Sequence, residues 1–359
     1  MPLIALGVNH QTAPVEVREK VAVGETQMAE TLQQLQQLDG VEEAALVSTC
    51  NRTEIYARID EGRAPAVVDW LARRNGLTAE ALSTYVYTHE GDAAVRHLFR
   101  VATGLDSLVL GEPQILGQVK DAWQQARGAG SLRTPLDRLF QQSFAVAKRV
   151  RTDTRIGAHP VSVAYAGVRL VRQVFAELDR ATVLLVGAGD TIELAAKHLV
   201  NAQAKRLLIA NRTLEHAQAL ASRVGGYALP LSEIERHLPE ADVVISATAA
   251  REPVLKASAV RDALKARKQK PVFLLDLAVP RDIEAAVAEL PNAYLYTVDD
   301  LEQVISDSKA SRQAAAEQAE AIIDLAVEHF GAWWRAQSQQ DSLRALRRAA
   351  ESAKADALA

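Results

Sequence analysis

Cysteine is almost absent from this chain of 359 residues, in which Cys50 is the only one. A single cysteine excludes a disulfide within the chain and any metal site built from several thiolates. It is typical of a reducing compartment, where a lone thiol persists and can act as a nucleophile. The chain also has no large excess of positive or negative charge, since 41 basic and 45 acidic residues give a net charge of −4. Any contact with a nucleic acid must therefore come from a local patch.

Long hydrophobic runs are also missing. The longest stretch without Asp, Glu, Lys or Arg runs from Ile156 to Val168, which is shorter than the ~18 residues needed to cross a bilayer. The N-terminus has no basic segment followed by a long apolar stretch, so we expect no signal peptide. With 48% hydrophobic and 24% charged residues, the composition excludes a disordered chain, a collagen and a membrane bundle. We expect a cytoplasmic protein.

Proline does not occur after Pro291, and Gly331 is the only glycine after Tyr227. Because both residues interrupt helices, this region can form very long ones. Apolar residues recur in it at helical spacing, at Leu301, Val304, Ile305, Ile322, Ile323, Ala326, Val327, Phe330 and Trp333. We expect one very long amphipathic helix, followed by a second that begins near Asp341. Such a helix cannot bury its apolar stripe alone, so it serves as a spine or an oligomer contact.

Two other patterns precede this region. Residues 1–157 alternate short apolar runs with helical stretches and then become mostly helical, which predicts an α+β domain. Gly157 and Pro160 interrupt the last helical stretch and mark a boundary. Over residues 158–298, apolar runs alternate with helical stretches, which predicts a doubly wound, Rossmann-like parallel sheet. The fold class is therefore a multidomain α/β protein, completed by the long helix and a C-terminal helical region over residues 299–359.

A glycine-rich turn opens the second pattern, in the segment Gly187-Ala188-Gly189-Asp190-Thr191-Ile192. Its two glycines permit a tight turn and bring a pyrophosphate close to a helix N-terminus, although Ile192 replaces the usual third glycine. After the next strand, NAD enzymes place an acidic residue on the ribose, whereas this chain has Asn211-Arg212. Arg212 can pair with a 2′-phosphate, which favours NADP(H). The alternative is a helix cap followed by a solvated arginine.

The lone cysteine lies among polar residues, in Ser48-Thr49-Cys50-Asn51-Arg52, at an expected turn between two strands. A free cysteine is often a small buried hydrophobic residue, and that alternative stays open on composition alone. Here Arg52 would favour the thiolate and offer a guanidinium to a substrate carboxylate. A thiolate beside a nicotinamide domain indicates attack on an acyl carbon, followed by hydride transfer to the thioester to give an aldehyde.

Two more segments carry polar groups. His97 lies on a mixed helical face, where a half-buried structural histidine is the alternative to a role in proton transfer. The segment 104–118 mixes three glycines with Ser107, Glu112, Gln114 and Gln118. These residue types suit a pocket lining, and an ordinary helical hairpin with an N-cap is the alternative.

These segments resemble the glutamyl-tRNA reductase family. The resemblance is carried by Gly7–Pro14, Ser48–Tyr56, Gly104–Lys120, Phe144–Gly157, Gly187–Ile192 and Asp276–Asp282, and it extends to about Leu301. The segments around Cys50 and Gly104 are specific to that family. The resemblance implies that Cys50 attacks the ester carbonyl of glutamyl-tRNA(Glu) and expels the tRNA. NADPH then reduces the thioester to glutamate-1-semialdehyde, the first committed step of 5-aminolevulinate and tetrapyrrole (haem) biosynthesis.

The resemblance also implies roles for particular residues. Cys50 and His97 match the positions important for activity, and Arg52 would bind the α-carboxylate of the glutamate. The positions that match substrate contacts are Thr49, Cys50, Asn51, Arg52, Ser107, Glu112, Pro113, Gln114 and Gln118. The positions that match the NADP-binding loop are Gly187, Ala188, Gly189, Asp190, Thr191 and Ile192. We expect no metal site.

Further implications concern domains and partners. By resemblance, residues 1–157 recognise glutamyl-tRNA, residues 158–298 bind NADPH, and residues 299–359 form the spinal helix and the dimerisation region of a V-shaped homodimer. The chain ends at Ala359, before the family's usual C-terminal bundle, so we expect a shortened dimerisation region. The aminomutase that consumes the unstable aldehyde is the expected transient partner.

Two other functions are compatible with parts of the pattern. A shikimate-dehydrogenase-like NADP ketone reductase would use the nucleotide domain and give Cys50 no role. A tRNA-binding regulatory protein that only senses NADPH would have an unreactive thiol and would consume no NADPH.

Overall fold

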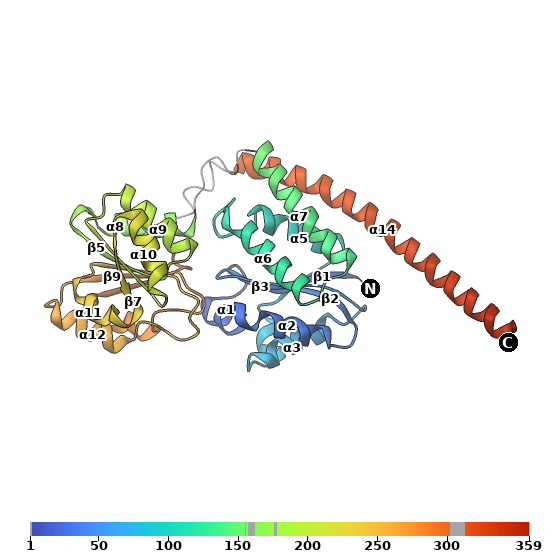
Figure 1. Ribbon diagram of the computed structural model, residues 1–359, viewed down its shortest axis with the longest axis horizontal. Coiled ribbons are helices and arrows are strands. Elements are labelled where there is room, and N and C mark those ends of the chain that lie inside the picture. Colours follow the sequence, from blue (N-terminus) through green and yellow to red (C-terminus); the bar gives the residue numbers. More distant parts are fainter. Residues whose placement is uncertain (1, 155, 157–161, 176–177, 302–312, 359) are drawn as a thin grey trace.

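The protein was analysed as a computed structural model, which describes residues 2–154, 156, 162–175, 178–301 and 313–358 (Figure 1). In its last helix, side chains are described for residues 315–337. No helix in the described ranges is both long and apolar enough to cross a membrane. The cytoplasmic location stays a prediction, as does the domain boundary at residue 157, which lies outside the described residues.

The first domain is built on a four-stranded sheet in the order β2-β3-β1-β4, whose neighbouring strands pair antiparallel. Every residue of β1 is buried, so both faces of the sheet need covering helices. Figure 1 shows α2 and α3 on one face and α5, α6 and α7 on the other. The strands are β1 (Leu3–Asn9), β2 (Val41–Ser48), β3 (Arg52–Ile59) and β4 (Tyr87–Glu90). The helices are α1 (Val15–Val21), α2 (Glu25–Gln36), α3 (Ala64–Arg74), α4 (Ala79–Ser83), α5 (Asp92–Thr103), α6 (Gln114–Gly128) and α7 (Thr134–Asp153).

The second domain has a six-stranded sheet in the order β10-β9-β8-β5-β6-β7, with every neighbouring pair parallel. Its strand order reverses between β5 and β8, so the doubly wound fold predicted from the sequence is confirmed. The strands are β5 (Thr182–Val186), β6 (Arg206–Asn211), β7 (Tyr227–Pro230), β8 (Val243–Ser246), β9 (Val272–Asp276) and β10 (Ala293–Thr297). The helices are α8 (Val163–Val174), α9 (Asp190–Asn201), α10 (Leu214–Val224), α11 (Ile234–His237) and α12 (Ala257–Ala266).

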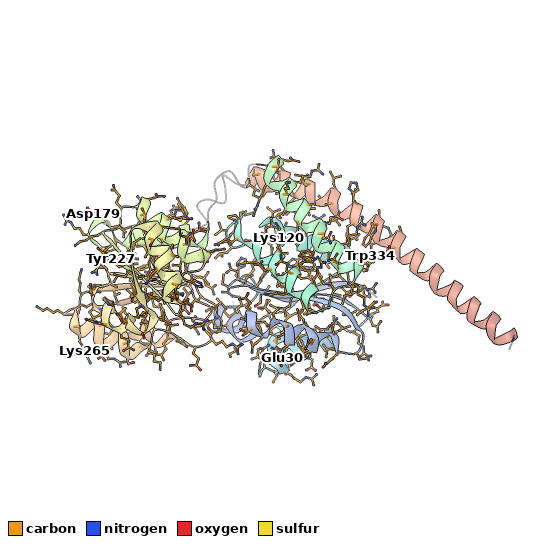
Figure 2. All side chains as sticks on the ribbon, in the orientation of Figure 1. Glu30, Lys120, Asp179, Tyr227, Lys265 and Trp334 are labelled. Carbon is orange, nitrogen blue, oxygen red and sulfur yellow. The ribbon has the colours of Figure 1, made fainter. Side chains whose placement is uncertain are left out.

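The last helix, α14 (Gln313–Leu358), runs 46 residues without interruption. Its N-terminal half packs on the first domain through Ala319, Ile323 and Phe330, with Trp333 and Trp334 beside them. Figure 2 labels Trp334 on this part of the helix. Its C-terminal half extends away from both domains (Figure 1). The predicted long helix is confirmed, but the predicted second helix near Asp341 is wrong. The reason is that the segment holds no glycine or proline and is rich in strong helix formers. Val304 and Ile305 of the expected stripe lie outside the described residues.

Charged contacts join the two domains along α1. Arg281, which follows β9, donates hydrogen bonds to Glu19 at 2.8 and 3.0 Å and pairs with Glu16 at 3.3 Å. Arg18 pairs with Asp299, which follows β10. Because Arg18 also donates to the carbonyl of Cys50, these contacts place the carboxyl ends of β9 and β10 near the turn between β2 and β3.

Candidate active site

A cavity of about 30 Å³ lies where the two domains meet. Its first-domain lining is Thr49, Cys50, Asn51, Arg52, Ser107, Glu112, Gln114, Ile115 and Gln118, and its second-domain lining is Val163, Thr191 and Leu277. Eight of the nine predicted substrate contacts therefore come together around one thiol. The ninth, Pro113, is outside the described lining, and its carbonyl accepts a hydrogen bond from Arg151 at 2.9 Å.

The thiol sits on a tight turn because β2 and β3 are joined by only three residues. The Thr49 N–H donates to the carbonyl of Arg52 at 2.8 Å, and the Asn51 N–H donates to Thr49 Oγ1 at 3.2 Å. The His10 N–H donates to the carbonyl of Asn51 at 2.9 Å, which ties the turn to the end of β1. The turn is thus fixed from both sides and presents Cys50 to the cavity.

The Cys50 thiol is half-buried and uncharged at neutral pH. Burial raises its pKa to about 12, the carboxylate of Glu112 adds to the rise, and Arg18 and Arg52 oppose it. Arg52 does favour the thiolate, as expected from the sequence, but the cost of desolvating the anion is larger. The nucleophile needs a base that removes its proton during attack.

Arg52 is 1% exposed and fills the space between two carboxylates. Its Nη1 donates to Glu54 at 2.6 Å and to Asp106 at 3.0 Å, and its Nη2 donates to the Asp106 carbonyl. Burial alone would raise the pKa of Glu54, but Arg52 and His97 hold it below its usual range. Within the described residues, the Arg52 Nε has no hydrogen-bond partner, although it is buried.

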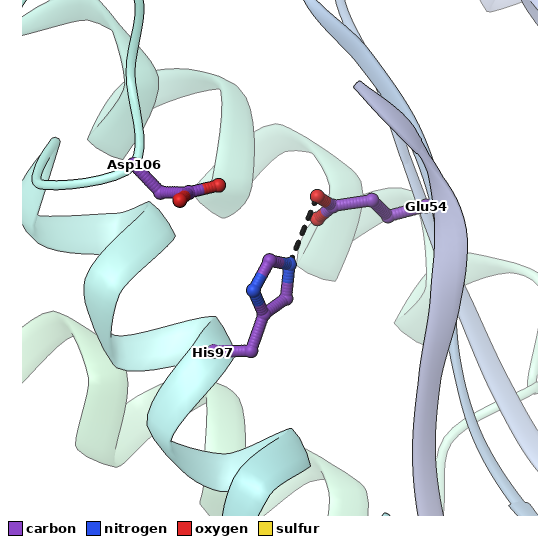
Figure 3. A group of neighbouring side chains, drawn as sticks. All are labelled: Glu54, His97 and Asp106. Atoms are coloured by element: carbon purple, nitrogen blue, oxygen red, sulfur yellow. Dashed lines mark hydrogen bonds and ion pairs between the residues drawn. The ribbon is translucent and has the colours of Figure 1, made fainter. Parts of the chain in front are cut away.

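His97 lies behind this pair and away from the lining of the thiol cavity. Its Nε2 is 3.0 Å from Glu54 Oε1 (Figure 3), and its ring contacts those of Tyr56, Tyr87 and His89. It faces a second cavity of about 440 Å³, on the other side of Arg52 and Asp106. The described contacts of His97 join it to Glu54 and not to the thiol, so His97 can act on the site through Glu54 and Arg52.

Glu54, His97 and Asp106 bring ligand atoms within 4.8 Å of one another, which is the kind of group that can hold a metal ion (Figure 3). The guanidinium of Arg52, however, already hydrogen-bonds to both carboxylates and supplies the positive charge between them. A cation would have to displace it at the cost of a buried ion pair. The chemistry of this cluster fits an arginine better than a metal.

The glycine-rich turn lies between β5 and α9, at the point where the strand order reverses. Gly187 has a φ of +112°, and a Cβ there would lie 2.5 Å from the Ala247 carbonyl, so a side chain cannot fit. A Cβ at Gly189 would meet nothing within 4 Å, which leaves open space at the start of α9. Ile192 is fully buried where a third glycine is usual, and it fills the gap between helix and sheet. The turn fits a dinucleotide pyrophosphate, and its Thr191 reaches the thiol cavity.

The end of β6 shows no acidic residue at the ribose position. The Asn211 side chain donates to the carbonyl of Thr213 at 2.9 Å, so it caps the following turn. Arg212 is exposed and makes no ion pair with any described residue. Its guanidinium is therefore available to an anionic group on a bound nucleotide.

Sequence reasoning missed the buried ionic groups behind the turn. Glu54, Tyr56 and Tyr87 converge on one another, since both tyrosine hydroxyls donate to the Glu54 carboxylate. Arg18 donates to the carbonyl of Cys50 itself. One signal was present in the sequence: Arg18 shares a helical face with Val15 and Val21, and a charge on an apolar face needs a buried partner.

Comparisons with known proteins agree with this arrangement. Residues 6–154 match the model of the glutamyl-tRNA reductase N-terminal domain, residues 169–304 that of shikimate / quinate 5-dehydrogenase, and residues 318–359 that of the glutamyl-tRNA reductase dimerisation domain. The shikimate-dehydrogenase-like ketone reductase considered above is thus wrong as a function, because that likeness covers the nucleotide domain alone.

Relatives that match the whole chain indicate the same family. A glutamyl-tRNA reductase of Xanthomonas oryzae pv. oryzae is 60% identical over the whole chain, which covers 82% of that protein. One of Xanthomonas campestris pv. phaseoli is 59% identical, with 83% of it covered. The solved glutamyl-tRNA reductase of Methanopyrus kandleri shares 32% identity, covering 96% of this chain and 82% of that one, with a TM-score of 0.48. The chain belongs to the glutamyl-tRNA reductase family.

Proposed function

We propose that the protein is an NADPH-dependent glutamyl-tRNA reductase, which converts glutamyl-tRNA(Glu) into glutamate-1-semialdehyde through a thioester on Cys50. The observation that carries the proposal is the cavity between the domains, where the only cysteine lies beside Thr191 of the nucleotide-binding turn. A thioester formed there would lie next to a hydride donor. The product would enter 5-aminolevulinate and tetrapyrrole biosynthesis.

Two residues that line the cavity have buried polar atoms that suit the charged groups of a glutamyl ester. The buried Arg52 Nε is a cationic donor, and the buried Asn51 Oδ1 is an acceptor, and neither has a partner within the described residues. A buried polar group without a partner is costly, so such atoms mark places where a ligand binds. The α-carboxyl group of a glutamyl-tRNA is the ester that Cys50 attacks, so the expectation that Arg52 binds an α-carboxylate is wrong. The Arg52 Nε suits the free γ-carboxylate of the glutamyl group, and the Asn51 Oδ1 suits its α-ammonium. Thr49, Ser107, Gln114 and Gln118 complete the polar lining.

Glu112 is the group we assign as proton acceptor. It is the only acidic or histidine side chain in the described lining of the cavity. Burial raises its pKa to about 7, although the Val163 N–H and Arg52 oppose the rise. As the sulfur of Cys50 bonds to the ester carbon, its proton passes to Glu112. When the bond to the ribose oxygen breaks, Glu112 returns that proton to the tRNA hydroxyl, which restores the carboxylate.

Replacing Glu112 with glutamine should slow acylation of Cys50 by about 10²-fold, the usual contribution of a positioned base. Because the carboxylate is the active form and its pKa is about 7, the wild-type rate should rise as pH passes through neutrality and then level off. The variant should lack that rise, while Glu112→Asp should keep it at a lower rate. Single-turnover tRNA release measured against pH tests this, and a rise that persists in the glutamine variant would rule out Glu112 as the base.

The nucleotide turn presents residues that suit the pyrophosphate of a dinucleotide such as NADPH. Gly189 leaves room for the pyrophosphate at the N-terminus of α9, Gly187 permits the tight turn before it, and Ala188, Asp190 and Ile192 complete the loop. When bound, the dihydronicotinamide supplies the hydride that converts the thioester into the aldehyde. The protein itself holds the acyl group on Cys50. Val163 and Leu277 line the cavity from the second domain and keep water away from that group.

Replacing Arg212 with alanine should weaken NADPH binding by roughly 10- to 100-fold, since a charge-assisted contact with a 2′-phosphate contributes roughly 1.5–3 kcal/mol. NADH lacks that phosphate, so its affinity should stay within a factor of two. Equilibrium titration of both nucleotides tests this. Equal losses for the two would show that Arg212 does not read the 2′-phosphate.

We assign residues 1–157 to glutamyl-tRNA recognition, residues 158–298 to NADPH, and residues 299–359 to a homodimer contact. The last assignment is supported by the match of residues 318–359 to a dimerisation domain. An aminomutase that takes up the unstable aldehyde is the proposed transient partner.

The direct test supplies the protein with glutamyl-tRNA and NADPH and follows both NADPH oxidation and aldehyde formation. The proposal predicts one aldehyde per NADPH consumed, and no consumption with uncharged tRNA. A protein that only senses NADPH would bind it and consume none, and that result would reject the proposal.

A further inference from the structure

Arg18 occupies an unusual position for a charged residue. It lies on the buried face of α1, and its side chain is only 2% exposed. A buried guanidinium is costly unless its N–H groups find acceptors and its charge finds a partner. The contacts of Arg18 therefore have structural consequences.

Those contacts join three separate parts of the chain. The Nε donates to the Ala13 carbonyl at 3.1 Å, just before α1. The Nη1 donates to the carbonyl of Cys50, in the catalytic turn. The Nη2 donates to Asp299, which lies between Val298 and Leu301 of the second domain's core and is the only carboxylate paired with Arg18 in the described part of the chain. Because a guanidinium is rigid and planar, the position of each acceptor constrains the other two.

We propose that Arg18 is a positioning residue that couples docking of the nucleotide domain to the geometry of the Cys50 turn. With Asp299 in place, the guanidinium is fixed and holds the Cys50 carbonyl. Without it, a buried cation loses its only described carboxylate, and the guanidinium has to move toward water and release the turn. Given the proposed function, the thiol then reaches its attacking position only when the nicotinamide domain is beside it. An acyl group is thereby reduced instead of being lost to water.

The interface offers a matched control. Glu19 lies next to Arg18 in sequence on the same helix and pairs with Arg281 of the second domain. That pair also crosses the interface, but neither Glu19 nor Arg281 donates to or accepts from the Cys50 turn in the described hydrogen bonds. Asp299→Asn and Glu19→Gln each remove one charge from the same interface. They differ in their partners: Asp299 pairs with Arg18, which holds the Cys50 carbonyl, whereas Glu19 pairs with Arg281, which makes no described hydrogen bond to the turn.

The test uses the full-length protein and two readouts. The first is the rate of alkylation by iodoacetamide, which reports on Cys50 alone because the chain has no other cysteine. The second is the single-turnover rate of glutamyl transfer from glutamyl-tRNA. For Asp299→Asn we expect faster alkylation, since a released turn exposes the thiol, together with glutamyl transfer slowed by about tenfold, since small misplacements of reacting groups are costly. Glu19→Gln should stay within a factor of two on both.

A third variant separates charge from geometry. Arg18→Lys keeps a cation at the position but lacks the planar fork that reaches three acceptors, so it should behave like Asp299→Asn. Thermal unfolding of all variants checks that each is folded. The same response in Asp299→Asn and Glu19→Gln, or none in either, would overturn the coupling. Altered alkylation with no glutamyl transfer even in the wild type would leave the coupling standing and reject the proposed function instead.

Discussion

Replacing Cys50 with serine should lower the rate of aldehyde formation by about 10³-fold or more, the loss typical of a removed nucleophile. A serine hydroxyl is a poorer nucleophile than a thiol, and the oxygen ester it would form accepts hydride less readily than a thioester. The side chains are similar in size, and Cys50 is half-buried on a turn, so the fold should be retained. The measurement is the rate of NADPH oxidation with saturating glutamyl-tRNA.

Nucleotide binding provides the control for this variant. Cys50 is not part of the turn at Gly187–Ile192, so the affinity of Cys50→Ser for NADPH should equal that of the wild type. A serine variant that reduces glutamyl-tRNA at the wild-type rate would contradict the thioester route, because hydride would then reach the tRNA ester directly.

Replacing Arg52 with methionine should have the largest effect on stability. It leaves Glu54 and Asp106 without the cation that lies between them, and Glu54 is fully buried. Removing one partner from a buried ion pair costs roughly 3–5 kcal/mol in the free energy of unfolding. Urea unfolding at neutral pH measures it. The exposed pair of Arg73 with Asp69 supplies the control, since Arg73→Met should cost less than about 1 kcal/mol.

The pH dependence of that loss has a definite sign. In the wild type the pKa of Glu54 lies below its usual value of 4.5, so the pair contributes stability above that value and loses it as pH falls further. Without Arg52, mainly His97 and Tyr56 oppose the effect of burial, so we expect the pKa of Glu54 in the variant to rise above 4.5 and the variant to lose stability at pH values where the carboxylate must ionise. The difference between the two proteins should therefore shrink as pH falls from neutral toward 4.5. A difference that grows instead would mean that Arg52 does not stabilise the ionised carboxylate.

Local sequence patterns predicted the parts of the site that depend on local geometry. The turn at Cys50 follows from two strands with only three residues between them. The nucleotide turn follows from glycines at the junction of a strand and a helix, where a φ of +112° at Gly187 requires the absence of a side chain. The long helix follows from a segment without proline and with one glycine. Each of these features is set by neighbouring residues.

The electrostatics of the site depend on contacts between distant residues and could not be predicted in the same way. The sequence suggested that Arg52 acts on the Cys50 thiol two residues away. In the structure its Nη1 donates a hydrogen bond to Asp106, which lies 54 residues further along the chain. The Cys50 thiol stays protonated because burial in the folded chain raises its pKa. Burial depends on residues from several parts of the chain, so the sequence around Cys50 does not predict it. His97 also depends on a distant residue, since its Nε2 lies 3.0 Å from Glu54 Oε1, 43 residues away.

The covalent intermediate is the central claim, and mass spectrometry tests it most directly. Protein mixed with glutamyl-tRNA in the absence of NADPH, and quenched in acid, should carry one glutamyl group, and peptide analysis should place it on Cys50. Addition of NADPH before the quench should remove that group and yield the aldehyde. An unmodified Cys50 in a preparation that still reduces glutamyl-tRNA would contradict the account.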